Sequence, residues 1–305
     1  MAGGFTEADI PDQRGRTAIV TGANTGIGFE IARALAGKGA RVLLGCRDED
    51  KARQAMARIA SQVPGAALAF LPLDQADLGS VRRAAEIAAG EDRLDLLVNN
   101  AGVMFPPLTR TAQGHELQFG VNHLGTFALT GLLLPKLAGC PGARVVVTSS
   151  LAHRRGRIQW DDIDAQRGYH AANRYGDSKL MNLLHVQELD RRLRGAGSPV
   201  MAVACHPGVA ATELMRHGNA LARAIWPLVG KLLNSPAMGA WPALQAATDP
   251  AARPGGFYGP QGLWEARGPS GEASRTRPSL DAGLARRLWD LSVELTGVDP
   301  LPPAP

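Results

Sequence analysis

The 305-residue sequence predicts an α/β fold, with a single doubly wound domain, a mostly parallel central sheet and helices on both faces. Short apolar runs rich in β-branched residues alternate along the chain with amphipathic segments, which is typical of strands that alternate with helices. The apolar content of 45% is ample for a sheet covered on both faces. Repeated right-handed crossovers build such a sheet, and ligands then bind beyond the carboxyl ends of its strands.

One domain accounts for the whole alternating pattern. We expect it to span residues 14–298, after an N-terminal extension of residues 1–13 and before a proline-rich, disordered tail of residues 299–305. The strands are expected near residues 17–21, 40–45, 66–73, 94–99, 143–149 and 199–205.

The first strand leads into a glycine-rich turn and then a helix, in the order that a dinucleotide site needs. Gly22, Gly26 and Gly28 punctuate this turn, and the amphipathic segment 29–38 follows it. Glycines let the backbone approach a pyrophosphate closely, and the helix N-terminus offers free N–H groups and partial positive charge. The spacing G-x-x-x-G-x-G is neither the commoner G-x-G-x-x-G nor a Walker loop. We therefore expect a Rossmann-type site whose turn residues are Gly22, Asn24, Thr25, Gly26, Ile27 and Gly28.

Tyr175 and Lys179 stand four residues apart, and Ser150 ends the apolar run ARVVVTSS upstream of them. Residues at this spacing share a helix face, so a phenol and an ammonium can act on one substrate atom while a strand-end hydroxyl reaches it from the side. A neighbouring cation stabilises a phenolate and lowers the pKa of tyrosine from roughly 10 toward neutrality. The pattern predicts a proton-transfer site, although the Tyr–Lys spacing alone also fits an ordinary surface pair.

The motifs TGANTGIG, LLVNNAG, VNHLGTF, VTSS, YGDSK and CHPGV follow one another over roughly residues 14 to 260. Together they resemble the short-chain dehydrogenase/reductase family. Within that family, GCRDEDKA, TSSLAH and the terminal RRLWDLSVELTGV are most similar to the retinol-dehydrogenase-like branch and its soluble bacterial members. These motifs are highly specific for the family and only weakly specific for the substrate.

The resemblance implies a catalytic set. The family moves a hydride to or from a nicotinamide, with Tyr175 carrying the proton and Ser150 bonding to the substrate oxygen. Lys179 would also hold the nicotinamide ribose, and Asn122 would anchor a water that continues the proton path to solvent. Ser150 rather than Ser149 matches the family pattern, so we expect the Ser149 hydroxyl to bond to the backbone.

The residue after the second strand bears on the choice of cofactor. A carboxylate at this place would accept hydrogen bonds from the adenosine ribose and select NAD, but this chain has Cys46 followed by Arg47. A guanidinium suits a 2′-phosphate, so we predict that NADP(H) is favoured over NAD(H). The alternative is that Arg47 merely begins the polar segment DEDKARQAMARI.

The resemblance implies further cofactor contacts. Asp74, at the end of AALAFLPLD, would meet the adenine edge, and the Asn100 segment would pass close to the adenosine ribose. The segment after the sixth strand would pack against the nicotinamide carboxamide. Beyond the glycine turn, the expected cofactor residues are Arg47, Asp74, Gln75, Asn100, Ala101, Gly102, Tyr175, Lys179, Pro207, Gly208, Val209 and Thr212.

Two regions depart from the simple alternation. Residues 213–236 are apolar and contain Pro227, and the resemblance implies a mobile substrate lid here. The alternative is a helix packed on the core or on a second subunit. In residues 153–174, Trp160 either packs over the substrate or is partly buried in the core. Candidates for an apolar wall of the lid are Leu214, Met215, Ile225 and Trp226.

Composition excludes several other classes of function. The net charge of +5 and pI near 9.4 do not indicate a nucleic-acid binder, because basic residues are scattered among acids without interleaved aromatics. The seven histidines show no ligand spacing, so we expect no metal site and assign no role to His153 or His206.

Cysteine usage and apolar segments bear on localisation. Three cysteines without paired spacing indicate reduced thiols. No signal segment opens the chain, and the apolar stretch FALTGLLLPKLAG is too short to span a bilayer and is interrupted by Pro135 and Lys136. We therefore expect a soluble, cytoplasmic protein without a membrane anchor.

The leading hypothesis is an NADP(H)-dependent oxidoreductase that interconverts an apolar alcohol and its aldehyde or ketone. The alternatives are a catalytically idle nucleotide-binding scaffold or redox sensor, and a protochlorophyllide-reductase-like activity, which has a similar YxDSK motif. The presence of Asn122, Ser150, Tyr175 and Lys179 argues against an idle scaffold. The sequence leaves open the physiological substrate and whether the protein is a monomer or a homo-oligomer.

Overall fold

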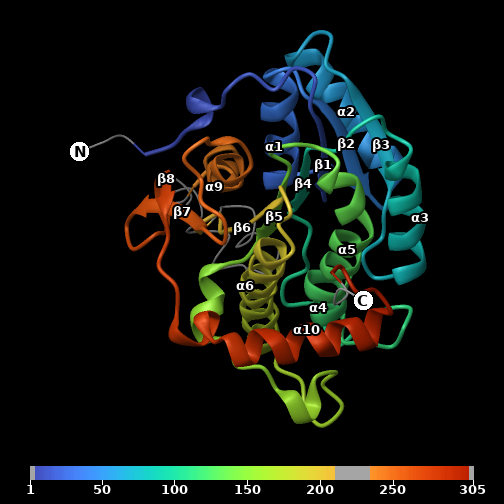
Figure 1. Cartoon of the computed structure of the whole chain (residues 1–305), viewed down its shortest axis with the longest axis vertical. Helices are drawn as coiled ribbons and strands as arrows, with labels where there is room; N and C mark the ends of the chain where they lie inside the picture. Colours follow the sequence, from blue (N-terminus) through green and yellow to red (C-terminus); the bar gives the residue numbers. More distant parts are fainter. Residues whose placement is uncertain (1–3, 210–233, 302–305) are drawn as a thin grey trace, which may run out of the picture.

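A central sheet lies between two layers of helices in the computed structural model, which describes residues 4–209 and 234–301 (Figure 1). Within these residues, eight strands form one sheet in the order β3-β2-β1-β4-β5-β6-β7-β8. All neighbouring pairs are parallel except β7 and β8, which are antiparallel. The predicted doubly wound α/β fold is confirmed.

The strands are β1 (Thr17–Thr21), β2 (Arg41–Cys46), β3 (Leu68–Pro72), β4 (Leu96–Asn99), β5 (Arg144–Thr148), β6 (Met201–Cys205), β7 (Phe257–Gly262) and β8 (Arg267–Glu272). The helices and helical turns are η1 (Glu7–Asp9), α1 (Gly26–Gly37), α2 (Glu49–Gln62), α3 (Leu78–Ala89), α4 (Leu117–Phe119), η2 (Gly120–Leu124), α5 (Gly125–Ala138), η3 (Leu151–Arg155), η4 (Trp160–Asp162), α6 (Ala171–Gly195), α9 (Pro236–Thr248), η6 (Arg277–Leu280) and α10 (Ala282–Thr296).

The sheet has a hydrophobic core on each face. Successive side chains of a strand point to opposite faces, so in β1 Ile19 enters one core while Ala18 and Val20 enter the other. The first core includes side chains of α3, α5, α6 and α10, and the second includes those of α1, α2 and α9. Because both faces are covered, the central strands are apolar throughout, which explains why they were recognisable in the sequence.

The last two strands were not predicted. The segments FYGPQG and RGPSGE contain glycine and proline, which normally indicate loops. In the structure β7 extends the sheet beyond β6, and β8 closes it as an antiparallel edge strand. Phe5 of the N-terminal extension pairs with Ser270 at this edge.

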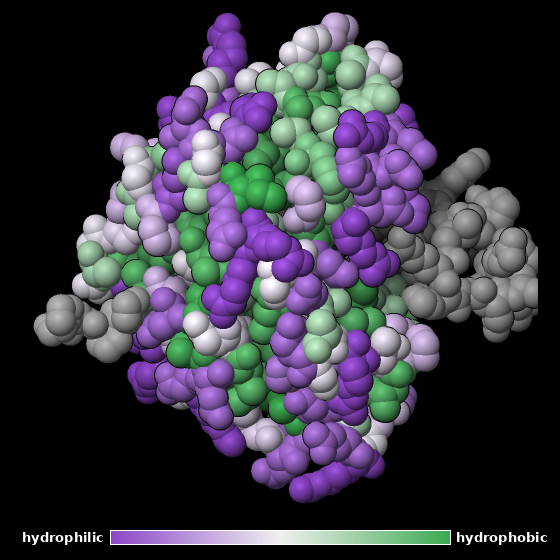
Figure 2. All heavy atoms as spheres, turned by 90° about the vertical axis from the view of Figure 1, so that its right-hand side faces the viewer, coloured by the Kyte–Doolittle hydropathy of each residue, from purple (hydrophilic) through white to green (hydrophobic). Residues whose placement is uncertain are grey.

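Among residues 4–209 and 234–301, one long apolar helical stretch lies inside the molecule. The stretch Leu117–Ala138 comprises α4, η2 and α5, and it is long and apolar enough to cross a membrane. However, 89% of its most apolar 18-residue segment is buried inside the protein. Pro135 does not interrupt it, contrary to our expectation: α5 continues through this proline to Ala138, and the missing proline N–H removes only one bond of the helix. On the face beside α3, by contrast, hydrophilic and hydrophobic residues are intermixed (Figure 2).

Candidate active site

The predicted site residues that follow strands gather at one edge of the sheet. Strands β1 to β6 are parallel, so the segments after them all emerge at the carboxyl edge. This edge brings together the glycine turn after β1, Arg47 after β2, Asn100 after β4, Ser150 after β5 and Pro207 after β6. Three further predicted residues come from the helices that pack beside it.

The glycine turn packs tightly against the ends of β1 and β4. Gly22 and Gly26 have φ values of 67° and 57°, in the left-handed region that favours glycine. A Cβ atom at Gly28 would lie 2.4 Å from the Gly22 carbonyl oxygen and 2.6 Å from Asn100 Nδ2. The first turn of α1 therefore approaches the strand ends at a distance that only glycine permits.

The N-terminus of α1 is suited to an anion. Its N-cap residue, Thr25, makes no side-chain capping bond, and the first turn carries no acidic residue. The next two helices differ, because Asp48 and Asp77 accept backbone N–H bonds at their starts. The first N–H groups of α1 thus retain their partial positive charge, and they fit the pyrophosphate of a dinucleotide.

The residues expected near the adenosine differ in their surroundings. Arg47 is exposed directly after β2, and no carboxylate among residues 4–209 and 234–301 forms an ion pair with it. Asp74 accepts a bond from Ala76 N at 2.9 Å. Gln75 is buried, and its amide donates to Val121 O and Thr126 Oγ1. The cofactor contact expected of Gln75 stays a prediction.

The Asn100 segment is fixed to the end of β1. The backbone N–H groups of Asn100 and Ala101 both donate to Thr21 Oγ1, at 3.0 and 2.9 Å, and Asn100 Nδ2 donates to Thr21 O. Gly102 then passes the catalytic candidates: a Cβ atom on it would lie 3.1 Å from Asn122 Oδ1 and 3.4 Å from Lys179 Nζ. The segment expected at the adenosine ribose thus borders the proton-transfer residues.

Tyr175 and Lys179 occupy the buried side of α6. Their exposed fractions are only 5% and 3%. Lys179 Nζ lies 5.6 Å from the centroid of the Tyr175 ring and donates to Thr148 O at 3.1 Å. A buried ammonium is costly unless it is hydrogen-bonded, so the carbonyl at the end of β5 helps to hold this cation beside the phenol.

The two serines after β5 have different hydrogen bonds. Ser149 Oγ donates to Lys179 O at 2.7 Å, which confirms that this hydroxyl bonds to the backbone. Ser150 Oγ caps η3 by accepting from Ala152 N at 3.2 Å, so its own hydrogen can still be donated. The turn η3 packs against α6, which brings the Ser150 segment to the helix that carries Tyr175.

Asn122 lies in the π-helical turn η2, a kind of turn that is frequent at functional sites. Its Oδ1 accepts from Val103 N at 2.7 Å, and its Nδ2 donates to Val103 O at 2.9 Å and to Ser178 Oγ at 3.0 Å. The side chain of Asn122 therefore joins the segment after β4 to α6, next to Lys179.

Two residues of the site were missed by the sequence analysis. His206 is fully buried; its Nδ1 accepts from Gly208 N, and its Nε2 lies 3.2 Å from Glu265 Oε2. Glu265 also pairs with Arg154 at 2.8 Å. Burial opposes ionisation of Glu265, but hydrogen bonds from His206 and Ser274 outweigh it and lower its pKa to about 2. This carboxylate thus links the segment after β6 to the turn after Ser150.

The remaining residues singled out in the sequence have different places in the structure. Trp160 belongs to an apolar cluster with α6 and α10, and the Arg287 guanidinium stacks on it at 4.1 Å, which corresponds to the core alternative. His153 Nδ1 lies 2.7 Å from Ser150 O. The residues that lie outside the described ranges are Thr212, Leu214, Met215, Ile225, Trp226 and Pro227.

Comparison with known proteins identifies the family. Residues 16–221 match the family model described as short chain dehydrogenase. The chain is 41% identical to mouse (Mus musculus) retinol dehydrogenase 12, over 98% of this chain and 91% of that protein. It is 42% identical to human (Homo sapiens) retinol dehydrogenase 13, over 96% of this chain and 87% of that protein.

Solved structures agree with this assignment. An uncharacterized protein from Mycobacterium paratuberculosis has a TM-score of 0.81 and 39% identity, covering 98% of this chain and 99% of its own. A short chain dehydrogenase from Escherichia coli CFT073, complexed with NADPH, has a TM-score of 0.59 and 26% identity, covering 78% of this chain and 92% of its own. The chain belongs to the short-chain dehydrogenase family of oxidoreductases, in its retinol-dehydrogenase-like branch.

Proposed function

We propose that this oxidoreductase uses NADP(H) to interconvert an apolar alcohol and its aldehyde or ketone. The observation that carries the proposal is the meeting of buried Tyr175 and Lys179 with the Ser150 segment at the end of β5. A phenol, an ammonium and a hydroxyl in this arrangement suit proton transfer to an oxygen whose carbon gains or loses a hydride. A bound nicotinamide would supply or accept that hydride.

Each side chain has one role in this proposal. Tyr175 donates a proton to the substrate oxygen during reduction and removes it during oxidation. Ser150 donates a hydrogen bond to the same oxygen, and the Lys179 ammonium stabilises the phenolate of Tyr175. The amide of Asn122 bonds to Val103 and Ser178, and these contacts fix the residue that is proposed to anchor a water on the proton path.

The preference for NADP(H) is supported by Arg47, whose exposed guanidinium follows β2 where a carboxylate would select NAD. The E. coli relative complexed with NADPH is consistent with it. An apolar substrate is suggested by the names of the retinol dehydrogenases that the chain resembles. A cytoplasmic location is part of the proposal, and it is supported by three buried cysteines that form no disulfide.

A carbonyl panel tests this function. The purified protein is mixed with long-chain, aromatic and polyene aldehydes or ketones, and the loss of NADPH absorbance is followed, with NADH for comparison. We expect turnover of apolar carbonyls and a faster reaction with NADPH. Binding of NADPH without turnover of any carbonyl would instead support an idle scaffold, and turnover that requires light would support a protochlorophyllide-reductase-like activity.

A further inference from the structure

Phe105 has an unusual backbone conformation beside the candidate site. It lies in the loop that follows the Asn100 segment, and its φ of 55° is in the left-handed region. A bulky side chain rarely adopts this conformation, and such strained residues persist only where the surrounding structure fixes them, often at active sites. Phe105 is 36% exposed, so the strain does not serve to bury this residue in the core.

The Phe105 ring touches the proposed acid/base residue. Its centroid lies 5.3 Å from that of the Tyr175 ring, and the two planes meet at 79°, an edge-to-face contact. Tyr175 itself is almost fully buried, whereas Phe105 keeps part of its surface exposed. Phe105 therefore lies against the residue that would meet the substrate oxygen, and part of its own surface is exposed.

Buried Gln118 holds the strained turn in place. Its Oε1 accepts from Phe105 N at 3.1 Å, and its Nε2 donates to Ala171 O at 2.9 Å. Tyr169 OH donates to Pro106 O at 2.6 Å. Since Ala171 is the first residue of α6, the Phe105 turn is tied to the same helix that positions Tyr175.

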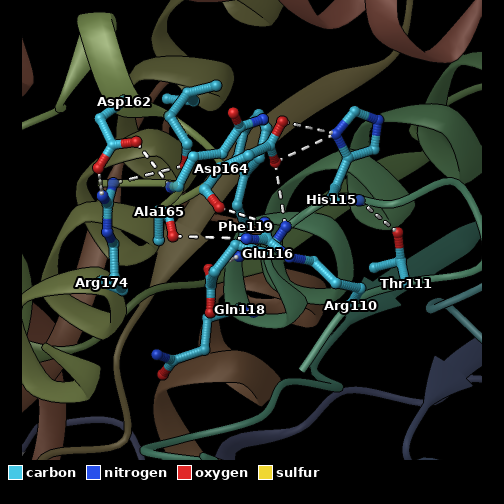
Figure 3. A network of polar contacts seen from close by, with 12 residues as sticks. Arg110, Thr111, His115, Glu116, Gln118, Phe119, Asp162, Asp164, Ala165 and Arg174 are labelled. Atoms are coloured by element: carbon cyan, nitrogen blue, oxygen red, sulfur yellow. Dashed lines mark hydrogen bonds and ion pairs between the residues drawn. The ribbon is translucent and has the colours of Figure 1, made fainter. Parts of the chain in front are cut away.

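A wider polar network fixes Gln118 in turn (Figure 3). Fully buried Glu116 accepts bonds from the backbone N–H groups of Gln118 and Phe119, at 3.0 and 2.8 Å. Glu116 N donates to Asp164 Oδ1 at 3.0 Å, and His115 Nδ1 lies 3.2 Å from the same carboxylate. The loop before α4 is thus joined to the loop before α6. These contacts hold Gln118, and Gln118 in turn holds the Phe105 turn in place.

We infer that Phe105 determines specificity in the proposed reaction, by selecting substrates with an apolar group next to the reacting carbonyl. The inference rests on the proposed function. The benzene ring offers no hydrogen-bond partner, so a hydroxylated group placed against it loses water contacts without replacement. An apolar group at this place gains by leaving water instead.

The test compares two aldehydes in Phe105→Ala and Phe105→Gly. The alanine variant removes the ring and keeps the backbone strain, whereas glycine removes both. Decanal represents apolar substrates, glyceraldehyde represents hydroxylated ones, and NADPH is the cofactor. Leu108→Ala is the control, because Leu108 is 47% exposed in the same loop.

We expect both Phe105 variants to lower kcat/KM for decanal by about tenfold, mainly through KM. The kcat/KM for glyceraldehyde and the KM for NADPH should change less than about twofold, and Leu108→Ala should leave both aldehydes nearly unaffected. If the Phe105 variants lowered kcat/KM equally for the two aldehydes, or for neither, the inference would be overturned. The proposed function would still stand, because the unaltered protein would be active. An unaltered protein that reduces neither aldehyde nor any other carbonyl would overturn both.

Discussion

Lys179 is the residue that joins the separate parts of the candidate site. Its Nζ donates to Thr148 O at 3.1 Å, its carbonyl accepts from Ser149 Oγ at 2.7 Å, and Gly102 lies beside its ammonium. The end of β5, the segment after β4 and the helix with Tyr175 therefore meet at one cation. This convergence is what the proposed proton transfer at Tyr175 requires of the fold.

Arg47→Asp tests the phosphate contact at the other end of the cofactor. Loss of the guanidinium and gain of a carboxylate should disfavour a 2′-phosphate, so we expect the ratio of kcat/KM for NADPH to that for NADH to fall by at least about tenfold. Arg53→Asp is the control, because Arg53 is an exposed arginine of α2 paired with Glu49. An unchanged ratio in Arg47→Asp would show that the proposed phosphate contact is wrong.

The local part of the site was predictable from the sequence, and the part that depends on distant contacts was not. The glycine turn and the Tyr175–Lys179 pair are recognisable because their chemistry depends on short spacings along one turn or helix. Glu265 carries no such signal, since it meets His206 only when the β7–β8 hairpin folds back over the end of β6. Phe105 was missed for a similar reason, because its position depends on Gln118.

At the scale of elements, the β7–β8 hairpin supports the segment after β6. Three consecutive residues, Leu263, Trp264 and Glu265, have φ values of 45°, 54° and 67°, and this unusual turn directs Glu265 back toward His206. Val209 N also donates to Ala266 O at 2.9 Å. The hairpin was not predicted because its strands contain glycine and proline, yet it holds the segment expected to contact the nicotinamide.

Glu265→Gln tests this support. The substitution removes the charge that pairs with Arg154 and weakens the contact with His206, so the segment from Pro207 to Val209 should be held less firmly. We expect the KM for NADPH to rise by roughly three- to tenfold and the KM for the carbonyl to change little. Glu272→Gln, an exposed change on β8, should leave both constants unaltered, and an equal response of the two variants would argue against the proposed support.

At the scale of the whole molecule, α5, α6 and α10 meet around two buried histidines, His123 and His185. His123 directly follows Asn122 in the chain, and His185 lies beyond Lys179 on α6. His185 stacks with Trp289 at 5.9 Å, and His123 Nε2 lies 2.8 Å from Ser292 Oγ. Burial lowers the pKa of both histidines to about 3, from an ordinary value of 6.5. Both imidazoles are therefore neutral in the folded protein at neutral pH.

This burial should make the protein sensitive to acid. Because the folded pKa lies below the unfolded one, the stability contributed by each neutral histidine is complete above pH 6.5 and is lost as the pH falls toward about 3. His185→Phe should reduce the pH dependence of the unfolding free energy in this window by about 1.4 kcal/mol per pH unit, as measured by urea unfolding between pH 7 and 5. His170→Asn removes an exposed histidine instead, and a similar reduction there would contradict this explanation.

In the proposed reaction, buried Tyr175 transfers the proton at a site built from β5, η3 and α6. Turnover and NADPH binding measured together in Tyr175→Phe test it most directly. We expect kcat for an apolar aldehyde to fall by at least about 100-fold, while the Kd for NADPH changes less than about twofold. Turnover close to that of the unaltered protein, with the fold intact, would contradict it.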